Sequence, residues 1–355
     1  MKLDKRNWEK VKFGDVCSLV NENTKSAKED GLEYVIGLEH ITPNDLHIRS
    51  WSTTDTDTTF TRIFRKGQVL FGRRRTYQRK VAYTEFEGIC SGDIMVFQAK
   101  ENLLPELLPF IVQSEGFFQL AVNTSAGSLS PRTKFNDLAN YEFLLPPKEE
   151  QARLAELLWA ADEVVESVSV IKNTLGIINR LLLQSLSVLN RRSETKLGNI
   201  VDFHYGKALK ESERKKGDYP VVGSAGVTGC HDKFIIEGPG IVVGRKGASG
   251  NVTWVEENFW PIDTAYWVNV KNKEINLYYI YLLLKSMELD KLSITTAIPG
   301  LNREDALSEK ANIPSFKEQN MTLSEFEKLN DSFRKQKTHI NNANQLKINL
   351  INQIF

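Results

Sequence analysis

The sequence has few cysteines, no long apolar run and almost no net charge. Its three cysteines, Cys17, Cys90 and Cys230, are odd in number and far apart, which excludes a disulfide framework and a paired-cysteine motif. Apolar stretches such as residues 280–284 are far shorter than the roughly 18 residues of a membrane span. The charged start at residues 1–6 lacks the apolar core of a signal peptide. These absences predict a cytoplasmic protein with no membrane partner.

The charge balance excludes one class of nucleic-acid-binding protein. With 46 basic and 45 acidic residues the formal net charge is +1, whereas a protein that coats nucleic acid without preference is strongly basic. Any contact with nucleic acid must therefore come from a local patch. One such patch exists, because the stretch from Arg62 to Lys80 holds eight Lys or Arg residues and no Asp or Glu.

The sequence also lacks the motifs of a catalytic chain. It has no phosphate-binding loop, no dinucleotide fingerprint, no nucleophile elbow and no Asn/Asp-Pro-Pro-aromatic motif of an amino-methyltransferase. None of its five histidines stands at metal-ligand spacing. The sequence therefore predicts that this chain is not itself an enzyme, has no catalytic residues and binds no metal.

An internal repeat organises the chain. A length of 355 residues allows two to three domains. Comparison of the sequence with itself shows that it contains two copies of one unit. Five short segments recur in the same order, which chance does not produce. The matching pairs are residues 11–17 and 195–201, 34–37 and 219–223, 69–74 and 241–246, 92–96 and 262–266, and 145–151 and 313–319.

Each copy has two parts, which together predict an α+β protein. The first part is rich in short β-branched and aromatic runs between turn residues and reads as a mixed α/β domain. The second part is a long helix. We therefore predict domains at 1–145 and 193–313, a central helical spacer at 146–192 and a C-terminal helical spacer at 314–355. The two long helices are expected to form an antiparallel coiled coil, which gives the fold a pseudo-twofold internal repeat.

The coiled coil is predicted from apolar residues that recur at alternating steps of three and four over about five heptads. Gln336 and Lys347 interrupt the second series, where Leu346 offers an apolar replacement for Lys347. The alternative is that each helix recruits another protein instead of its counterpart. The predicted seam consists of Leu154, Leu157, Val164, Val168, Ile171, Leu175, Ile178 and Leu182 in the first helix and of Phe326, Leu329, Phe333, Ile340 and Leu350 in the second.

Two loops at equivalent places in the copies have the composition of DNA-reading loops. Each follows an apolar strand and a glycine and begins with basic residues. Arginine binds a guanine edge with two hydrogen bonds, Gln and Asn do the same for adenine, and further cations hold phosphates. The alternative is a solvated charged hairpin, which the recurrence makes less favoured. The candidate residues are Arg73, Arg74, Arg75, Tyr77, Gln78, Arg79 and Lys80 in the first copy and Arg245, Lys246, Ser249 and Asn251 in the second.

A second pair of loops is a weaker candidate. Residues 125–132 and 295–303 combine small polar residues with a final arginine, which suits close approach to a phosphate or base. A simple capping turn is an equally good interpretation. The candidate residues here are Ser128 and Arg132, with Asn302 and Arg303 in the second copy. A third pair, residues 44–49 and 223–232, is the least favoured.

At this point the motifs resemble those of a known family. Leu-Pro-Pro-x-Glu-Glu-Gln at 145–151, its altered copy at 313–319, residues 34–41, and residues 238–247 with 260–264 are similar to the specificity (S) subunits of type I restriction-modification systems. The resemblance covers nearly the whole chain. The sequence departs from the pattern at Ser315, where the family has a second proline.

The resemblance implies a DNA-binding role within a larger complex. The domains at 1–145 and 193–313 would be target-recognition domains that each read one half of a bipartite, asymmetric site in double-stranded DNA. The helices would space the domains and dock two methyltransferase (M) subunits, which translocase-nuclease (R) subunits then join. S-adenosylmethionine, ATP and Mg²⁺ would bind to those partners, and this chain would hold no cofactor. Arg73, Arg74, Arg75, Arg245 and Lys246 would lie on DNA-facing loops.

Three other functions are weighed against this one. The nearest is the equivalent specificity subunit of a type II system with a fused methyltransferase and nuclease. A coiled-coil scaffold with two domains that do not bind DNA is less favoured. A solitary enzyme is the weakest alternative, because no catalytic motif was found.

Overall fold

The computed structural model describes residues 3–55, 58–188, 194–272, 274–292 and 300–355. The chain divides into two compact units, unit 1 with Met1–Ser169 and Thr338–Phe355 and unit 2 with Val170–Lys337. Both long helices contribute a segment to each unit. The end of the predicted central spacer, residues 189–192, and residues 295–299 of the second candidate loop lie outside the described residues.

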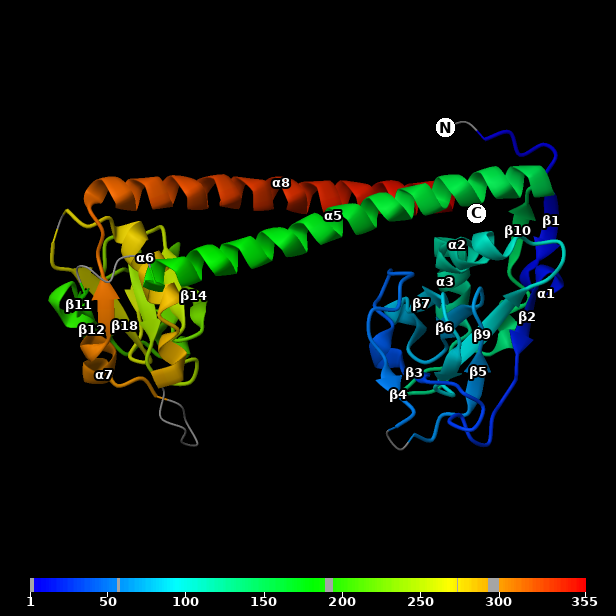
Figure 1. Ribbon diagram of the computed structural model, residues 1–355, viewed down its shortest axis with the longest axis horizontal. Helices are drawn as coiled ribbons and strands as arrows, with labels where there is room; N and C mark the ends of the chain where they lie inside the picture. The colour runs from blue at the N-terminus through cyan, green and yellow to red at the C-terminus, as the bar shows by residue number, and fades with distance from the viewer. Residues whose placement is uncertain (1–2, 56–57, 189–193, 273, 293–299) are drawn as a thin grey trace. The chain divides into compact units, whose positions relative to one another are not determined.

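Unit 1 contains two four-stranded sheets and a two-stranded ribbon (Figure 1). The first sheet is antiparallel in the order β2-β9-β6-β7, and the second has the order β4-β3-β8-β5 with β3 and β8 parallel. The antiparallel ribbon joins β1 to β10. The strands are β1 (Glu9–Lys12), β2 (Cys17–Val20), β3 (Tyr34–Ile36), β4 (Ser52–Thr53), β5 (Arg62–Phe64), β6 (Val69–Gly72), β7 (Val81–Tyr83), β8 (Gly88–Cys90), β9 (Ile94–Ala99) and β10 (Glu142–Leu145).

Aromatic packing dominates the core of unit 1. Phe13, Phe71, Phe97 and Phe117 are fully buried and touch one another at ring-centroid distances of 4.8–5.7 Å. Such rings bury large apolar areas and pack edge to face or offset. The short helices that complete this core are α1 (Phe13–Val16), α2 (Leu108–Gln113), α3 (Glu115–Asn123) and α4 (Phe135–Leu138), with 3₁₀ turns η1 (Leu38–His40), η2 (Thr76–Gln78) and η3 (Pro105–Leu107).

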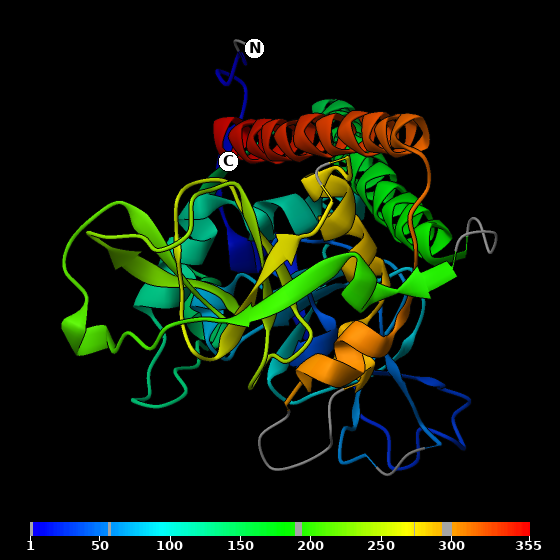
Figure 2. The same ribbon diagram turned by 90° about the vertical axis from the view of Figure 1, so that its left-hand side faces the viewer.

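Unit 2 is built to the same plan (Figure 2). An antiparallel sheet has the order β12-β18-β15-β16, a second sheet has the order β14-β13-β17 with β13 and β17 parallel, and a ribbon joins β11 to β19. The strands are β11 (Glu194–Lys196), β12 (Val201–Tyr205), β13 (Tyr219–Gly223), β14 (Gly226–His231), β15 (Gly240–Gly244), β16 (Val252–Val255), β17 (Trp260–Pro261), β18 (Ala265–Val270) and β19 (Lys310–Asn312). The short helices are α6 (Leu277–Ser286) and α7 (Arg303–Ser308), with 3₁₀ turns η5 (Leu197–Asn199), η6 (Glu211–Glu213) and η7 (Leu289–Leu292).

The repeat extends to single hydrogen bonds. In unit 1 the Lys100 ammonium donates to the carbonyl of Gly14, and in unit 2 the Lys271 ammonium donates to the carbonyl of Gly198. The strand register also corrects one detail of the sequence repeat. Because Gly72 pairs with Ile94 and Gly244 pairs with Ala265, the counterpart of Asp93 is Thr264 and not Asp263.

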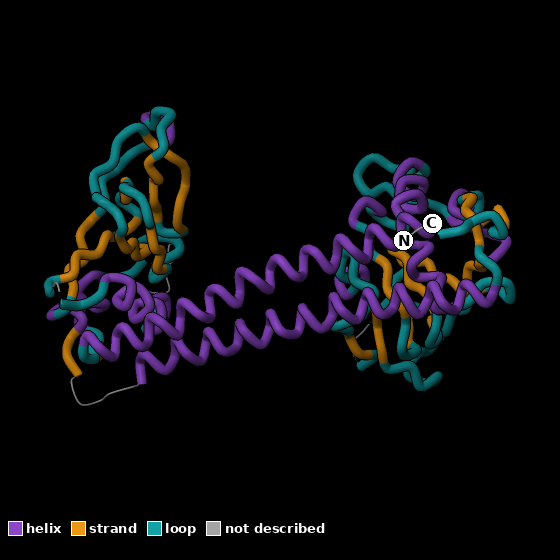
Figure 3. Tube along the Cα trace, turned by 90° about the horizontal axis from the view of Figure 1, so that it is seen from above, coloured by secondary structure: helices purple, strands orange, loops and turns teal. Residues whose placement is uncertain are grey.

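Two long helices follow the globular parts, α5 (Lys148–Val188) and α8 (Phe316–Ile354) (Figure 3). Pro146 and Pro147 separate β10 from α5. Because the residue before a proline avoids the helical conformation, the helix begins only after Pro147. Ser315 begins α8 in a different way, by a capping box. Its hydroxyl accepts from the Glu318 N–H (3.4 Å), and Glu318 Oε2 accepts from the Ser315 N–H (2.9 Å). Ser315 therefore supplies a helix start that needs no second proline.

In each unit the segments of α5 and α8 pack together in opposite directions. In unit 1 Leu154, Ala155 and Leu158 of α5 share an apolar cluster with Ile351 and Ile354 near the end of α8. In unit 2 the late residues of α5 meet the early residues of α8, with Leu186 beside Leu323 and Phe326 in one cluster and Leu182 at its edge.

The buried face of α5 differs from the predicted seam. Val164, Ile171 and Ile178 are 51%, 44% and 41% exposed. The reason is that α5 carries adjacent apolar pairs at both seam positions, such as 157–158, 164–165 and 177–178, so a spacing of three and four fits two neighbouring faces. Of the remaining seam residues, Leu154, Phe326 and Leu329 are buried and Leu157, Val168, Leu175, Leu182, Phe333, Ile340 and Leu350 are half-buried.

The expectation that Leu346 replaces Lys347 in the seam of α8 is wrong. Leu346 is 56% exposed, whereas Lys347 is 3% exposed. The Lys347 ammonium lies 2.7 Å from Asp162 Oδ1 on α5, and His47 Nε2 lies 2.8 Å from Asp162 Oδ2. Burial raises the pKa of Asp162, but the bonds to His47 and Lys347 outweigh burial and lower it, so the carboxylate is ionised. A buried charge is tolerated in the seam because its partner is buried with it.

Among the described residues, no helix is long and apolar enough to cross a membrane.

The buried pair makes a prediction for stability. Lys347→Met leaves Asp162 buried with His47 as its remaining partner, so we expect a loss of about 3 kcal/mol, at the low end of the range for breaking a buried pair. Asp162→Leu combined with Lys347→Met removes both charges and should be more stable than Lys347→Met alone. Denaturant unfolding measures both, with Asn341→Met at an exposed site of α8 as the control. A double variant less stable than the single one would contradict this account.

Candidate nucleic-acid interface

The basic loop of unit 1 follows β6 and is held by the fold. Arg75 and Arg79 flank the turn η2 and both adopt the left-handed conformation, with φ of 53°. Between them Thr76 is buried, and its hydroxyl lies 3.0 Å from Ser125 Oγ and 3.3 Å from the Ala121 carbonyl oxygen. These contacts fix the loop against the end of α3, so its exposed side chains project from a rigid turn.

The structure brings the two candidate loops of unit 1 together. The Arg75 N–H donates to the Pro131 carbonyl (2.8 Å), and the Thr133 N–H donates to the Arg73 carbonyl (3.1 Å). Arg74 and Arg132 face each other in an isolated β-bridge. Residues 73–75 and 131–133 thus form one surface, which neither loop forms alone.

Asp93, which the sequence analysis did not select, lies at the centre of this surface. Its carboxylate accepts from Arg132 Nε (2.7 Å) and from Arg74 Nη1 (3.2 Å). Burial opposes ionisation of Asp93, but the two arginines outweigh it and lower the pKa. Arg74 also donates to Ser130 Oγ (2.9 Å). Asp93 therefore holds two arginines from two loops in fixed positions.

Unlike Arg74 and Arg132, Arg73 is not paired with Asp93. Its Nε is buried and has no hydrogen-bond partner among the residues that the structure describes. Burial lowers the pKa of Arg73, and so do the nearby charges of Arg62 and Arg132, against the smaller opposite effect of Asp93. Arg73 as a whole is half-buried, so its side chain remains partly open to solvent. Arg73 is thus suited to an anionic or base-edge acceptor.

The other candidates of unit 1 divide into two groups. Arg79 pairs with Glu115 (2.5 Å) and covers the Phe118 ring, and the Lys80 ammonium donates to the Leu38 carbonyl (2.6 Å), so both are occupied within the fold. In contrast, Tyr77 is 59% exposed. Arg75 and Ser128 are also exposed, and Gln78 is half-buried.

Unit 2 repeats the backbone arrangement of the interface. Arg245 follows the last residue of β15, its N–H donates to the Thr264 carbonyl (2.9 Å), and its carbonyl accepts from the Leu301 N–H (2.9 Å). In unit 1 the Arg73 N–H donates to the Asp93 carbonyl (2.9 Å) in the same way. Lys246 and Gly300 then form the bridge that joins the loops. The buried Nε of Arg245 likewise has no partner within the described part of the chain.

The side chains around Arg245 differ from those around Arg73. Thr264 stands where unit 1 has Asp93, so no carboxylate comes from that strand position. Instead the ring of Tyr205, at the end of β12, contacts the guanidinium groups of both Arg245 and Arg303, which lie 5.2 Å and 5.5 Å from its centroid. Tyr205 is 54% exposed. Charge patterning did not select Tyr205, because neither residue next to it in the sequence is Lys or Arg.

The remaining candidates of unit 2 are partly used by the fold. Asn302 caps α7, since its side-chain oxygen accepts from the Glu304 N–H (2.8 Å), as a capping turn requires. Arg303 pairs with Glu304 (2.9 Å). Asn251 donates to the Ser224 carbonyl (3.1 Å). Ser249 is buried and Lys246 is exposed.

The third, least favoured pair of loops also has internal uses. Arg49 in unit 1 pairs with Asp45 and with Glu166 of α5, so it anchors the domain to its helix. Residues 226–231 of unit 2 form strand β14. These loops contribute no comparable group of exposed cations among the described residues.

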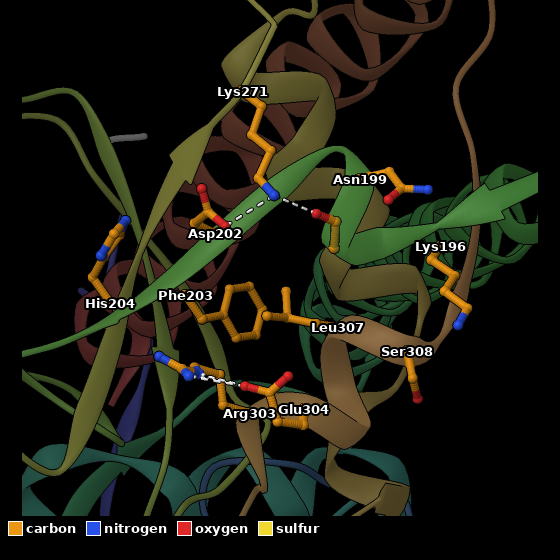
Figure 4. Close-up of a pocket in the computed structure, with 11 residues that line it drawn as sticks. Lys196, Asn199, Asp202, Phe203, His204, Lys271, Arg303, Glu304, Leu307 and Ser308 are labelled. Carbon is orange, nitrogen blue, oxygen red and sulfur yellow. Dashed lines mark hydrogen bonds and ion pairs between the residues drawn. The ribbon is translucent and has the colours of Figure 1, made fainter.

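A hollow of about 480 Å³ in unit 2 lies beside Arg303 (Figure 4). Two of the cations that line it are engaged: Lys271 lies 3.0 Å from Asp202 and bonds the Gly198 carbonyl, and Arg303 pairs with Glu304. The lysine bond is the one that Lys100 repeats in unit 1. We therefore assign these contacts to the fold. Among the described residues, no group of three or more His, Cys, Asp or Glu side chains is placed to hold a metal ion.

Comparison with known proteins identifies the family. The model of the type I restriction modification DNA specificity domain matches residues 5–175 and again residues 193–345. The chain therefore belongs to this family, and the two matches are its two repeats. The resemblance inferred from the motifs is confirmed.

One curated relative and two solved structures illustrate the likeness. The chain is similar to the type I restriction enzyme EcoDI specificity subunit of Escherichia coli, at 26% identity over 187 residues, which span 49% of this chain and 39% of that protein. It resembles a structure of a type I restriction-modification system with a TM-score of 0.69 at 17% identity, over 100% of this chain and 98% of that one. It also resembles the S subunit from M. genitalium, with a TM-score of 0.59 at 19% identity and the same coverage. These likenesses confirm the α+β fold with two repeats and long helices that pack together.

Proposed function

We propose that this chain is the sequence-specific DNA-binding subunit of a type I restriction-modification complex. One observation carries the proposal: each unit presents a half-buried arginine, Arg73 or Arg245, directly after a central strand and held by the same backbone hydrogen bonds. Arginine in a rigid loop with free donors is the commonest reader of guanine in a major groove. Membership of the specificity family supports this assignment.

The two units would read different half-sites. Unit 1 surrounds its reading arginine with Arg74, Arg132 and Asp93, whereas unit 2 uses Tyr205 and Arg303. A carboxylate and an aromatic ring present different hydrogen-bonding and stacking chemistry to a base pair. The target is therefore a bipartite, asymmetric site in double-stranded DNA. The helices would keep the two readers a fixed distance apart.

The partners would be methyltransferase and translocase-nuclease subunits. On α5, five apolar side chains of unit 2 are at least 41% exposed and follow one side of the helix; we call this set the α5 stripe, and it consists of Val170, Ile171, Ile177, Ile178 and Leu181. A continuous apolar stripe on a helix is typical of a protein interface. We assign it to methyltransferase docking. The chain is then non-catalytic, acts in the cytoplasm and leaves S-adenosylmethionine, ATP and Mg²⁺ to its partners.

A scaffold that does not bind DNA is not favoured, because it would need no unpaired arginines at the same place in both units. The geometry of this chain would also suit the equivalent subunit of a type II system with a fused methyltransferase and nuclease. The family match, which is to the type I domain, favours the type I complex.

The first prediction concerns the reading arginines. Arg73→Ala with Arg74→Ala should weaken binding through one half-site by about 1–3 kcal/mol for each base that the arginines no longer bind, and leave the preference at the other half-site intact. Selection of bound duplexes from a random pool, with the chain in complex with its methyltransferase subunits, measures both preferences. Arg65→Ala, which removes a surface cation paired with Glu22 and Glu87, is the control. Loss of both halves together would contradict independent reading.

The second prediction concerns the spacing of the half-sites. An insertion of about one helical turn at facing positions of α5 and α8 lengthens each helix by about 5.4 Å. Because a base pair adds about 3.4 Å, the preferred gap should grow by roughly one or two base pairs. Mapping of methylated adenines in cells that carry the inserted variant measures the gap. An unchanged gap would show that the helices do not set the spacing.

The third prediction concerns the α5 stripe. Ile177→Glu places a charge in the apolar interface, so binding of methyltransferase subunits should fall at least tenfold while the S subunit stays folded. Lys172→Glu places the same side chain at an exposed position on another side of the helix and should bind normally. Co-purification with the methyltransferase subunit measures the difference. Equal binding by both variants would show that the methyltransferase subunits do not dock on the α5 stripe.

A further inference from the structure

The glutamine of the repeated motif occupies the same buried position in both units. Gln151 ends the first copy of the motif and Gln319 ends the second, and each lies in the first turns of its long helix. Their side chains are 1% and 2% exposed. Neither is part of the reading surfaces, so their burial in both copies needs another explanation.

In unit 1 the amide of Gln151 joins the start of α5 to the globular domain. Its oxygen accepts from the Leu104 N–H (2.8 Å), and its nitrogen donates to the carbonyls of Asn102 (3.0 Å) and Pro146 (2.9 Å). Leu104 begins the turn that leads into α2, and Pro146 precedes α5. One side chain thus fixes the start of the helix to the segment before α2.

In unit 2 Gln319 makes the equivalent bonds. Its oxygen accepts from the N–H of Asn276 (2.9 Å), the residue that caps α6, and its nitrogen donates to the carbonyl of Pro314 (3.0 Å). The segments that the two glutamines contact differ in sequence, but both units keep two equivalent hydrogen bonds. The glutamine oxygen accepts from a backbone N–H before a short helix, and the glutamine nitrogen donates to the carbonyl of a proline before the long helix.

Such a junction fixes both the position and the orientation of the long helix relative to its domain. The planar amide bonds a backbone group of the domain through its oxygen and the residues before the helix through its nitrogen. Buried backbone groups without partners cost about 1–3 kcal/mol each, which opposes any rotation of the helix away from the domain. The first turn of the helix is therefore held at one orientation against its own domain.

We propose that Gln151 and Gln319 are positioning residues that determine which gap between half-sites the complex accepts. This inference rests on the proposed DNA-reading function. A change of one base pair in the gap turns one half-site by about 35° around the duplex axis, since a turn contains about 10–10.5 base pairs. A reader whose domain is fixed on its helix rejects that rotation, whereas a loosened junction accommodates it.

The test uses the full chain in its methyltransferase complex. After the two half-sites have been identified by selection from random duplexes, affinity is measured for a series of duplexes whose gap varies by one base pair at a time. We expect the unmodified complex to prefer its best gap over the next by about tenfold or more. Gln151→Met and Gln319→Met, which keep the side-chain volume and remove the hydrogen bonds, should reduce this preference to about twofold, and base preferences within each half-site should stay unchanged.

A matched control separates positioning from stability. Gln68 is a buried glutamine inside unit 1 that bonds the Arg65 N–H (2.7 Å) and the Gln98 side chain (2.9 Å), away from the helix. Gln68→Met should lower stability and leave gap discrimination unchanged. If the junction variants lower affinity equally at all gaps, as a loss of folded protein would, the inference is overturned.

Gln151→Glu gives a second measurement should the methionine variants fold poorly. Burial raises the pKa of a carboxyl group, and the protonated form can accept from Leu104 and donate to one carbonyl as the amide does. Gap discrimination in this variant should be near normal at low pH and fall as pH rises through that pKa, while the unmodified complex shows no such change. A pH-independent variant would contradict the role of the hydrogen bonds. If the unmodified complex reads no bipartite site, it is the proposed function that fails.

Discussion

The whole arrangement depends on the attachment of each β-rich domain to the first turns of its long helix. In both units a buried glutamine amide, Gln151 or Gln319, makes this attachment through backbone groups. Backbone partners do not change when loop side chains change, so the junction is independent of what the loops read. This separation lets the reading surfaces diverge between units while the frame that carries them stays the same.

The two reading surfaces show how far that divergence goes. The strand order and the backbone bonds around Arg73 and Arg245 coincide, yet Asp93 faces the arginines of unit 1 and Tyr205 those of unit 2. Asp93 fixes Arg74 and Arg132 by charge and hydrogen bonds, whereas the Tyr205 ring contacts Arg245 without accepting its N–H groups in that way. Similar frames therefore hold their arginines by different side-chain contacts.

The sequence was sufficient for the repeat, the long helices and the basic loops, because each of these has a local signal in spacing or composition. It was insufficient where the outcome depends on which neighbour a side chain meets. Adjacent apolar pairs in α5 gave two equivalent faces, and only the packing partner selects between them. Lys347 was read as an interruption because its partner, Asp162, lies on the other helix. Asp93 and Tyr205 were missed for the same reason, since their roles arise from contacts with distant loops.

The near-zero net charge is consistent with this design. A strongly basic surface binds every duplex, because phosphate contacts carry no sequence information. Here Arg79, Arg49 and Arg65 are each paired with a carboxylate, so part of the basic charge is neutralised within the fold. Under the proposed function both half-sites are engaged at once, so a rigid junction at each end would raise affinity for the correct gap and specificity against every other gap together.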